Sequence, residues 1–128
     1  KVQATSRPGE LVDLSFNTHR PGRWLSLNFE MGNCSLNGRD ILGFMAKVQS
    51  EATMTFRVCV RSGGEGGFQD AFFGKRVISY AASSTHADLM KLEERDDVPA
   101  HAPWRELIIF LPPDVGQISL KDLALFGV

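Results

Sequence analysis

The stretch TMTFRVCVR, from Thr53 to Arg61, contains the alternation that decides the fold class. Apolar side chains occupy every second position, at Met54, Phe56, Val58 and Val60. The positions between them hold Thr55, Arg57, Cys59 and Arg61. Because successive side chains of a strand point to opposite faces, this spacing predicts a strand with one face against a core and the other toward solvent.

Other segments repeat this signal along the chain. WLSLNFEM, residues 24–31, alternates in the same way, and RELIIFL, residues 105–111, is almost continuously apolar, which predicts a strand covered on both sides. Further strands are expected in LVDLSF, DILGFMAKVQ, KRVISYA and ISLKDLALF, with turns rich in Gly, Pro, Asn and Asp between them. ADLMKLEER, residues 87–95, fits either a helix or a strand with a charged tail.

Seven or eight short strands with almost no helix predict an all-β protein, an antiparallel two-sheet β-sandwich. The expected core combines apolar residues of four strands: Leu25, Leu27, Phe29, Phe56, Val58, Val60, Ile108, Phe110 and Leu125. A chain of 128 residues is the size of one domain. Because it opens with Lys1 rather than Met, we expect residues 1–128 to be a single domain cut from a larger protein.

Composition argues against several classes of function. A net charge of −1 gives no basic footprint for a nucleic acid, and no apolar run approaches the ~20 residues of a membrane span. The three histidines lie in separate segments without zinc-ligand spacing, and no G-x-S-x-G motif is present. We therefore predict a domain that is not itself an enzyme, with no nucleic-acid or membrane partner.

The two cysteines do not make a disulfide evident. Cys34 lies in a turn-like segment and Cys59 in a strand-like one, so free thiols are favoured over a bridge. Neither cysteine adds a ligand to a zinc site.

The stretch RSGGEGGFQDAFFGKR, residues 61–76, raises the question of a ligand-binding loop. It lacks the lysine of a phosphate-binding loop, and Glu65 would repel phosphate, so SGGEGG is expected to be a hairpin turn or a connection between sheets. FQDAFF combines flat apolar rings with polar acceptors, which is the mixture that binds sugars. The alternative is that Phe72 or Phe73 anchors this segment to the core.

Candidate ligand-binding residues therefore fall into two groups. Arg57 and Arg61 share one side of the predicted strand and could hold a carboxylate or hydroxyls with their forked donors, unless that side is simply a solvated face. The second group lies on the rim formed by the following segment: Asp70, Phe72, Phe73 and Arg76. Trp24 and Trp104 each begin a strand, and for Trp104 a place in the core is favoured over a stacking platform.

The order of strands and two terminal signatures resemble the galactose-binding-like jelly rolls, which include many carbohydrate-binding modules of larger enzymes. The signatures are a strand that opens on Trp104 and ends at Pro112, and a last strand, Ile118 to Leu125, with an acid at Asp122. The resemblance implies a jelly-roll sandwich that binds a glycan on behalf of a larger protein. It also implies a structural calcium ion, for which Glu10 and Asp122 are the candidate ligands.

A different class of function fits the same residues. The FQDAFF segment could dock an adjacent protein domain or a second copy of the chain, which would make this a structural or protein-interaction domain. Apart from the possible calcium ion, no cofactor is expected.

Overall fold

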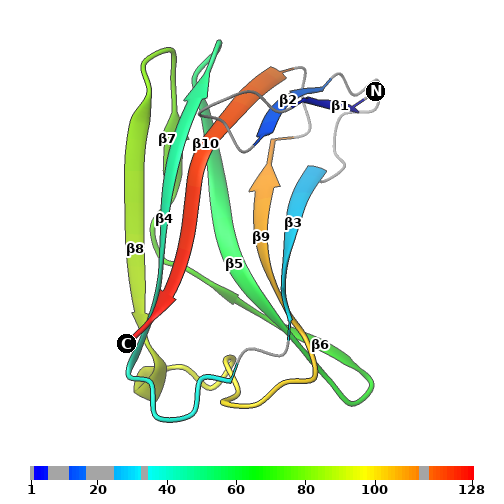
Figure 1. Cartoon of the computed structure of the whole chain (residues 1–128), viewed down its shortest axis with the longest axis vertical. Helices are drawn as coiled ribbons and strands as arrows, with labels where there is room; N and C mark the ends of the chain where they lie inside the picture. The colour runs from blue at the N-terminus through cyan, green and yellow to red at the C-terminus, as the bar shows by residue number, and fades with distance from the viewer. Residues whose placement is uncertain (1, 6–11, 17–24, 33–34, 113–115) are drawn as a thin grey trace.

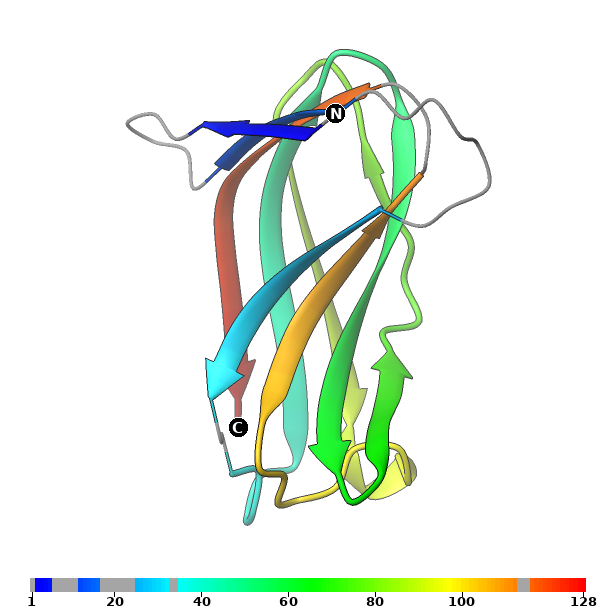
Figure 2. The ribbon, with the colours of Figure 1, turned by 90° about the vertical axis from the view of Figure 1, so that its right-hand side faces the viewer.

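The computed structural model describes residues 2–5, 12–16, 25–32, 35–112 and 116–128. These residues form two antiparallel sheets that lie face to face (Figures 1 and 2). The first sheet contains β1 (Val2–Thr5), β2 (Val12–Phe16), β10 (Gly116–Gly127), β4 (Ile41–Ser50) and β8 (Ser84–Lys91), in that spatial order. The second contains β3 (Leu25–Gly32), β9 (Arg105–Leu111), β5 (Met54–Gly64) and β6 (Gly67–Phe72). The predicted antiparallel β-sandwich is confirmed.

Two segments at the edges complete the architecture. The short strand β7 (Val77–Ser79) pairs with the first residues of β5, on the side away from β9 (Figure 1). The segment ADLMKLEER takes the strand alternative, because it forms the end of β8 followed by a single 3-10 turn at Leu92–Glu94. No helix in the described part of the chain is long and apolar enough to cross a membrane.

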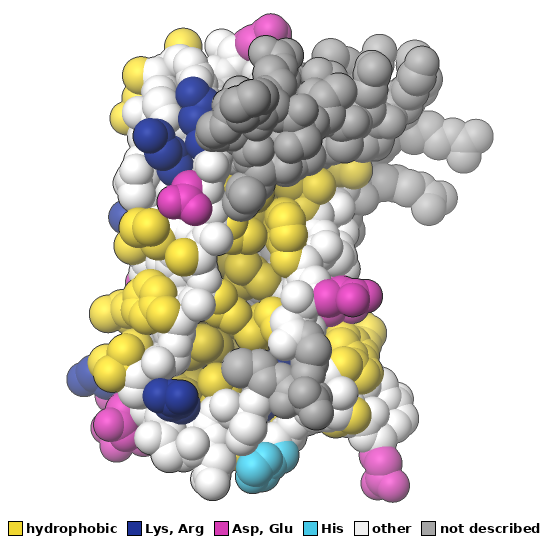
Figure 3. Space-filling model, in the orientation of Figure 1, with side chains coloured by type: hydrophobic (Ala, Val, Ile, Leu, Met, Phe, Trp, Pro, Cys, Tyr) yellow, Lys and Arg dark blue, Asp and Glu magenta, His cyan; other side chains and the backbone are white. Residues whose placement is uncertain are grey.

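The core lies between the sheets, and strand alternation fills it from both sides. In β5 the side chains of Phe56, Val58 and Val60 are buried, and in β4 those of Phe44 and Val48 meet them. The space-filling view shows hydrophobic side chains gathered in a stripe between the two layers (Figure 3). Full burial of each such side chain contributes about 1.5–3 kcal/mol to folding. The alternation predicted for residues 24–31 is also confirmed from Leu25 onward, because Leu25, Leu27, Phe29 and Met31 pack against this core while the residues between them are exposed.

The phase predicted for β9 is wrong. Leu107, Ile109 and Leu111 face the core, whereas Ile108 and Phe110 point to the opposite side of the sheet. Every residue from Leu107 to Leu111 is apolar, so the sequence of this strand does not show which alternate set faces inward. Leu125 on β10 does pack against the core, as predicted.

The glycine-rich stretch is a hairpin within one sheet, which is the first of its two predicted forms. Gly64 pairs with Gly67, so Glu65 and Gly66 are the two loop residues. Gly66 has a φ of +74°, a left-handed conformation that glycine adopts without a steric penalty. This tight turn fixes the register of β6 against β5, and the register in turn decides which side chains meet on the sheet surface.

Candidate functional site

The second sheet turns one face away from the core, and we call this surface the outer face. Pairing between the strands arranges its side chains in rows. One row places Glu106 of β9 beside Arg61 of β5 and Asp70 of β6, and the next places Ile108 beside Cys59 and Phe72. A third row pairs Phe110 with Arg57. Side chains of β9, β5 and β6 therefore meet on one surface, and Figure 2 shows these strands side by side with β3.

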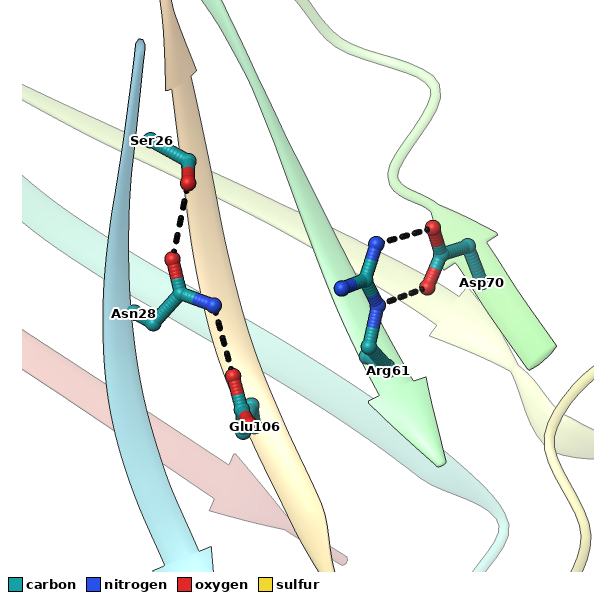
Figure 4. Close-up of polar contacts among 5 residues, drawn as sticks. All are labelled: Ser26, Asn28, Arg61, Asp70 and Glu106. Atoms are coloured by element: carbon teal, nitrogen blue, oxygen red, sulfur yellow. Dashed lines mark hydrogen bonds and ion pairs between the residues drawn. The ribbon is translucent and has the colours of Figure 1, made fainter. Parts of the chain in front are cut away.

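Arg61 is the best-anchored charge on the outer face. Its Nε donates a hydrogen bond to Asp70 Oδ1 at 2.7 Å, and its Nη2 donates to Asp70 Oδ2 at 2.9 Å (Figure 4). The guanidinium also covers the ring of Phe68, with 3.9 Å from Cζ to the ring centroid. The hydrogen bonds to Asp70 are the main reason that the pKa of Arg61 is raised above its ordinary value. Bidentate pairing and stacking together hold this side chain in one orientation.

A second polar chain crosses β3 and β9. Ser26 Oγ donates to Asn28 Oδ1 at 2.9 Å, and Asn28 Nδ2 donates to Glu106 Oε2 at 2.7 Å (Figure 4). Because the sequence places Ser26 and Asn28 two residues apart on one strand, both point to the same face. The result is an ordered line of donors and acceptors beside the Arg61–Asp70 pair.

Trp104 lies on the outer face and not in the core, contrary to the prediction. The position of its indole is fixed by Gly63, because a Cβ atom at Gly63 would lie only 2.2 Å from the indole Cε2. The backbone also joins the two residues, since the Gly63 amide donates to the Trp104 carbonyl at 2.9 Å. Trp104 is 37% exposed and Phe68 55% exposed. Gly63 is paired with Phe68, so both rings sit at the same end of the sheet.

The loop before β9 is tied to the sheet by a buried arginine. Arg105 is 1% exposed, and its Nη1 donates to Ser62 Oγ at 2.7 Å while its Nη2 donates to the carbonyls of Pro99 and Ala100. These backbone carbonyls and the Ser62 hydroxyl accept hydrogen bonds from the buried guanidinium, which offsets the cost of its burial. Because Arg105 directly follows Trp104, these bonds also fix the start of the segment that places the indole.

A pocket of about 540 Å³ opens at the other end of the outer face. It is lined by Thr55, Phe56, Arg57, Arg61, Phe72, Arg76, Phe110, Leu111 and Pro112. The Arg57 guanidinium covers the Phe72 ring, with 4.4 Å from Cζ to the ring centroid, and Phe72 lies 5.7 Å from Phe110 between centroids. The site thus has an aromatic end, a polar centre and a cationic pocket.

The structure brings together five of the six residues that the sequence suggested for ligand binding. Arg57, Arg61, Asp70 and Phe72 lie on the outer face, and Arg76 lines its pocket. Phe73 does not join them, because it is buried and packs edge-on against Phe44 of the opposite sheet at 4.7 Å. Phe73 is therefore the core anchor that was the alternative interpretation of FQDAFF.

Sequence reasoning missed four members of the outer face: Asn28, Glu106, Phe110 and Trp104. Asn28 sits on the polar side of a correctly predicted strand, so its orientation was available. Glu106 and Phe110 required the phase of β9, and Trp104 required its contact with Gly63. The only sequence signal for that contact is a glycine inside a strand, which often marks close approach of another group.

The predicted calcium ligands are not brought together in the part of the chain that the structure describes. Asp122 is exposed on β10 opposite Lys47, and Glu10 lies outside the described residues. Among the described residues, no group of three His, Cys, Asp or Glu could hold a metal ion. The calcium site remains a prediction.

Cys59 is a free thiol on the outer-face side of β5, buried beneath its neighbours. Burial raises its pKa to about 12, and Asp70 adds to this shift. A thiol held in its protonated form is a poor nucleophile. Cys34 lies outside the described residues, so its part in the cysteine prediction stays open.

Comparison with known proteins gives structural neighbours only. No family model matches the chain, and no curated protein matches it. Among solved structures, a family 4 carbohydrate-binding module has a TM-score of 0.69 at 12% identity, over 100% of this chain and 77% of the other. The xylan-binding module CBM22-1 from Paenibacillus barcinonensis Xyn10C has a TM-score of 0.64 at 12% identity, over 100% and 81%.

The chain has the jelly-roll fold of carbohydrate-binding modules. A family 11 module from Clostridium thermocellum, in complex with a β-1,3-1,4-mixed-linked tetrasaccharide, also matches. Its TM-score is 0.65 at 12% identity, over 100% of this chain and 84% of the other. The expectation of a jelly-roll sandwich is confirmed, while at these identities the likeness concerns the fold. Within this jelly roll, the outer face is the surface on which rings and fixed polar groups gather.

Proposed function

We propose that the chain is a non-catalytic carbohydrate-binding module of a larger protein and that it binds a glycan along the outer face. The observation that carries the proposal is the pairing of two exposed rings, Trp104 and Phe68, with polar side chains already held in place by hydrogen bonds. A ring can cover the C–H face of a sugar, while oriented donors and acceptors bind its hydroxyls.

The polar side chains of the outer face are already ordered by contacts within the protein. Arg61 is fixed by Asp70 and Phe68, and Glu106 is fixed by Asn28. Side chains that are ordered in the free protein lose less entropy on binding. Glu106, Arg61 and Asp70 lie in one row and the Asn28 amide lies in the next, so planar donors and acceptors face a sugar chain that lies across the strands.

Support also comes from the structural neighbours. Two of these neighbours, the xylan-binding module and the tetrasaccharide-bound module, have glycans as their ligands. The same jelly roll in this chain presents rings and ordered polar groups on one sheet face. The proposal for this chain rests on its own residues, and the glycan ligands of the neighbours support it.

The proposal that the module is non-catalytic rests on the hydrogen bonds that the two carboxylates of the outer face accept. Both oxygens of Asp70 accept hydrogen bonds from Arg61, and Glu106 accepts one from Asn28. Glycoside hydrolysis requires one carboxylic acid to protonate the leaving group and a second carboxylate on the other side of the bond. Two acids engaged with structural partners are poorly placed for those roles.

A glycan array probed with the labelled domain tests this function. We expect binding to one class of glycan, and loss of that binding when Trp104 and Phe68 are both replaced by alanine. The matched control is Phe126→Ala, which removes an exposed ring (39% exposed) from the first sheet. A folded domain that binds no glycan, or a double variant that binds as well as the parent, would refute the proposal.

The second candidate is a docking domain that uses the same rings to contact a partner domain or a second copy. It is favoured by the exposure of Phe68 and Trp104 at one end of the sheet. Light scattering separates the two candidates. A dimer that forms with increasing concentration and is abolished by Phe68→Ala would support docking, whereas a monomer that binds glycan supports the module.

A further inference from the structure

Arg57 carries a donor that nothing in the described protein satisfies. Its Nε atom is the one buried side-chain nitrogen or oxygen among the described residues that has no hydrogen-bond partner. An unsatisfied buried donor costs about 1–3 kcal/mol, so such a group calls for an explanation. Phe72 covers one face of the guanidinium but cannot accept the hydrogen bonds of its edge. The described residues supply no acceptor for this donor, and Arg57 also lines an open pocket.

The charges around the pocket specify what kind of acceptor would suit this donor. Of the described residues, three arginines line the pocket, Arg57, Arg61 and Arg76, and Asp70 pairs with only the second of them. No carboxylate in that part of the chain lines the pocket, because Glu106 lies in the row of Arg61 and not in the row of Arg57. The pocket is thus left with two cations, Arg57 and Arg76, that no acid in the described chain balances.

The backbone places these two cations together. Arg57 is on β5, and Arg76 is in the segment between β6 and β7, which runs along the same edge of β5 (Figure 2). Val77 pairs with Phe56 in an antiparallel register. Arg76 comes directly before Val77 and Arg57 directly after Phe56, so the pairing brings the two arginines close together. The arrangement therefore follows from strand pairing, and both side chains line the same 540 Å³ space.

We propose that this pocket binds an acidic sugar residue, so that the glycan ligand of the module carries a carboxylate or a sulfate ester. The anionic group accepts hydrogen bonds from the Arg57 guanidinium where that side chain lines the pocket, and Arg76 supplies the second positive charge. Phe110 and Pro112 form the apolar wall against which the sugar ring packs. This inference rests on the proposed function and narrows the class of glycan.

An anionic group suits the pocket better than a neutral hydroxyl for a physical reason. Hydrogen bonds in which both partners are charged are roughly twice as strong as neutral ones, and the forked donors of arginine match the geometry of a carboxylate. The apolar side chains of Phe72, Phe110 and Pro112 beside the arginines lower the local polarity, which strengthens the attraction further. A neutral sugar would leave both cations unbalanced.

Calorimetric titration with paired polysaccharides tests the inference. The acidic probes are polygalacturonate, alginate, glucuronoxylan and a sulfated galactan. Each is paired with its neutral form, obtained by reducing the carboxyl groups or by removing the sulfate. We expect at least one acidic polymer to bind at least about ten-fold more tightly than its neutral counterpart, and this preference to weaken as salt is added. The carboxylate and sulfate arms identify which acidic group is bound.

Substitutions at single residues test which side chains cause the preference for acidic polysaccharides. Arg57→Gln and Arg76→Gln should each abolish most of the preference for acidic glycans. Arg57→Lys should keep only part of the preference, because lysine retains the positive charge but lacks the two parallel N–H donors of the guanidinium. Lys75→Gln is the matched control, since it removes a neighbouring positive charge that does not line the pocket. Thermal unfolding of each variant shows that the fold is kept.

The outcomes distinguish the two proposals. Binding that is equally tight for the acidic and neutral forms, or a preference that survives Arg57→Gln and Arg76→Gln, would overturn the acidic-sugar inference while leaving the carbohydrate-binding function in place. A preference that Lys75→Gln removes as strongly would also overturn it, because the effect would then be one of overall charge. If a folded protein binds neither form of any glycan, both proposals fail.

Discussion

Arg61 and Asp70 form a two-bond ion pair across β5 and β6, at 2.7 and 2.9 Å, in the middle of the outer face. Both side chains are about one-fifth exposed, at 23% and 22%. A cross-strand pair of this exposure contributes little to folding, about 0.5–1 kcal/mol, so its larger effect is to orient Arg61 toward whatever lies on the sheet.

Asp70→Asn should therefore separate binding from stability. We expect the free energy of unfolding to fall by about 1 kcal/mol or less and glycan affinity to fall by about ten-fold, because Arg61 loses its fixed orientation. Urea unfolding measures the first effect and titration calorimetry the second. Equal and large losses in both would mean that the pair supports the fold and does not organise the site.

Gly63→Ala should displace Trp104. A methyl group at this position would lie 2.2 Å from the indole, so the ring must move away from the sheet. In a Trp24→Phe background, where Trp104 is the remaining tryptophan, we expect a red shift of fluorescence and a loss of glycan binding. Gly64→Ala is the control, because nothing lies within 4 Å of the added atom. Unchanged emission in Gly63→Ala would contradict the packing described for the indole.

Arg105→Met should destabilise the fold by about 2–4 kcal/mol, because it leaves Ser62 and the carbonyls of Pro99 and Ala100 without their buried donor. Chemical unfolding gives the value, and the exposed Arg39→Met serves as the comparison. A loss no greater than that of the control would show that the guanidinium does not hold the loop.

His86 should make stability depend on pH. Burial, and then Lys75, lower its pKa in the folded protein, while its ring lies 2.9 Å from Ser84 Oγ. As the pH falls below the ordinary value of about 6.5, the unfolded chain takes up the proton first. Stability is then greatest above that pH, declines below it, and levels off once the folded protein is also protonated.

The test is the pH dependence of urea unfolding in His86→Gln. This variant should lose the part of the decline that begins near pH 6.5, while His101→Gln, at an exposed position, should keep it. If the free energy of unfolding declined equally below pH 6.5 in the parent and in His86→Gln, groups other than His86 would cause the decline.

Cys59 should resist modification in the native state. Its pKa of about 12 and its burial leave almost no accessible thiolate at pH 8. In a Cys34→Ser background we expect no reaction with a disulfide reagent until denaturant is added, followed by one thiol per chain. Rapid labelling of the native protein would show that the outer face opens around this residue.

The fold was predictable where strands alternate and unpredictable where they do not. Val58 and Val60 against Arg57 and Arg61 reveal both faces of β5 directly, and the same holds for Leu27 and Asn28 in β3. β9 has no such contrast, since both alternate sets are apolar, and its phase depends on pairing with β3 and β5. Local sequence does not contain that register.

The candidate site was predictable to the extent that it follows from single strands. Arg57 and Arg61 could be placed on a polar face from their spacing, and Asp70 and Phe72 joined them through the hairpin. Phe72 and Phe73 have the same side chain, but Phe72, the last residue of β6, faces the outer surface and Phe73, directly after it, turns into the core. Trp104 depends on a contact with a glycine 41 positions earlier, which no local pattern shows.

Alternation along β3 and β5 also has a consequence for protein engineering. Inward residues such as Val58 hold the sandwich together, while outward residues such as Asn28, Arg57 and Arg61 contribute little to it. A combinatorial library that randomises only these outward positions would leave the interior unchanged in every clone. The chain could then serve as a scaffold from which binders with new specificities are selected.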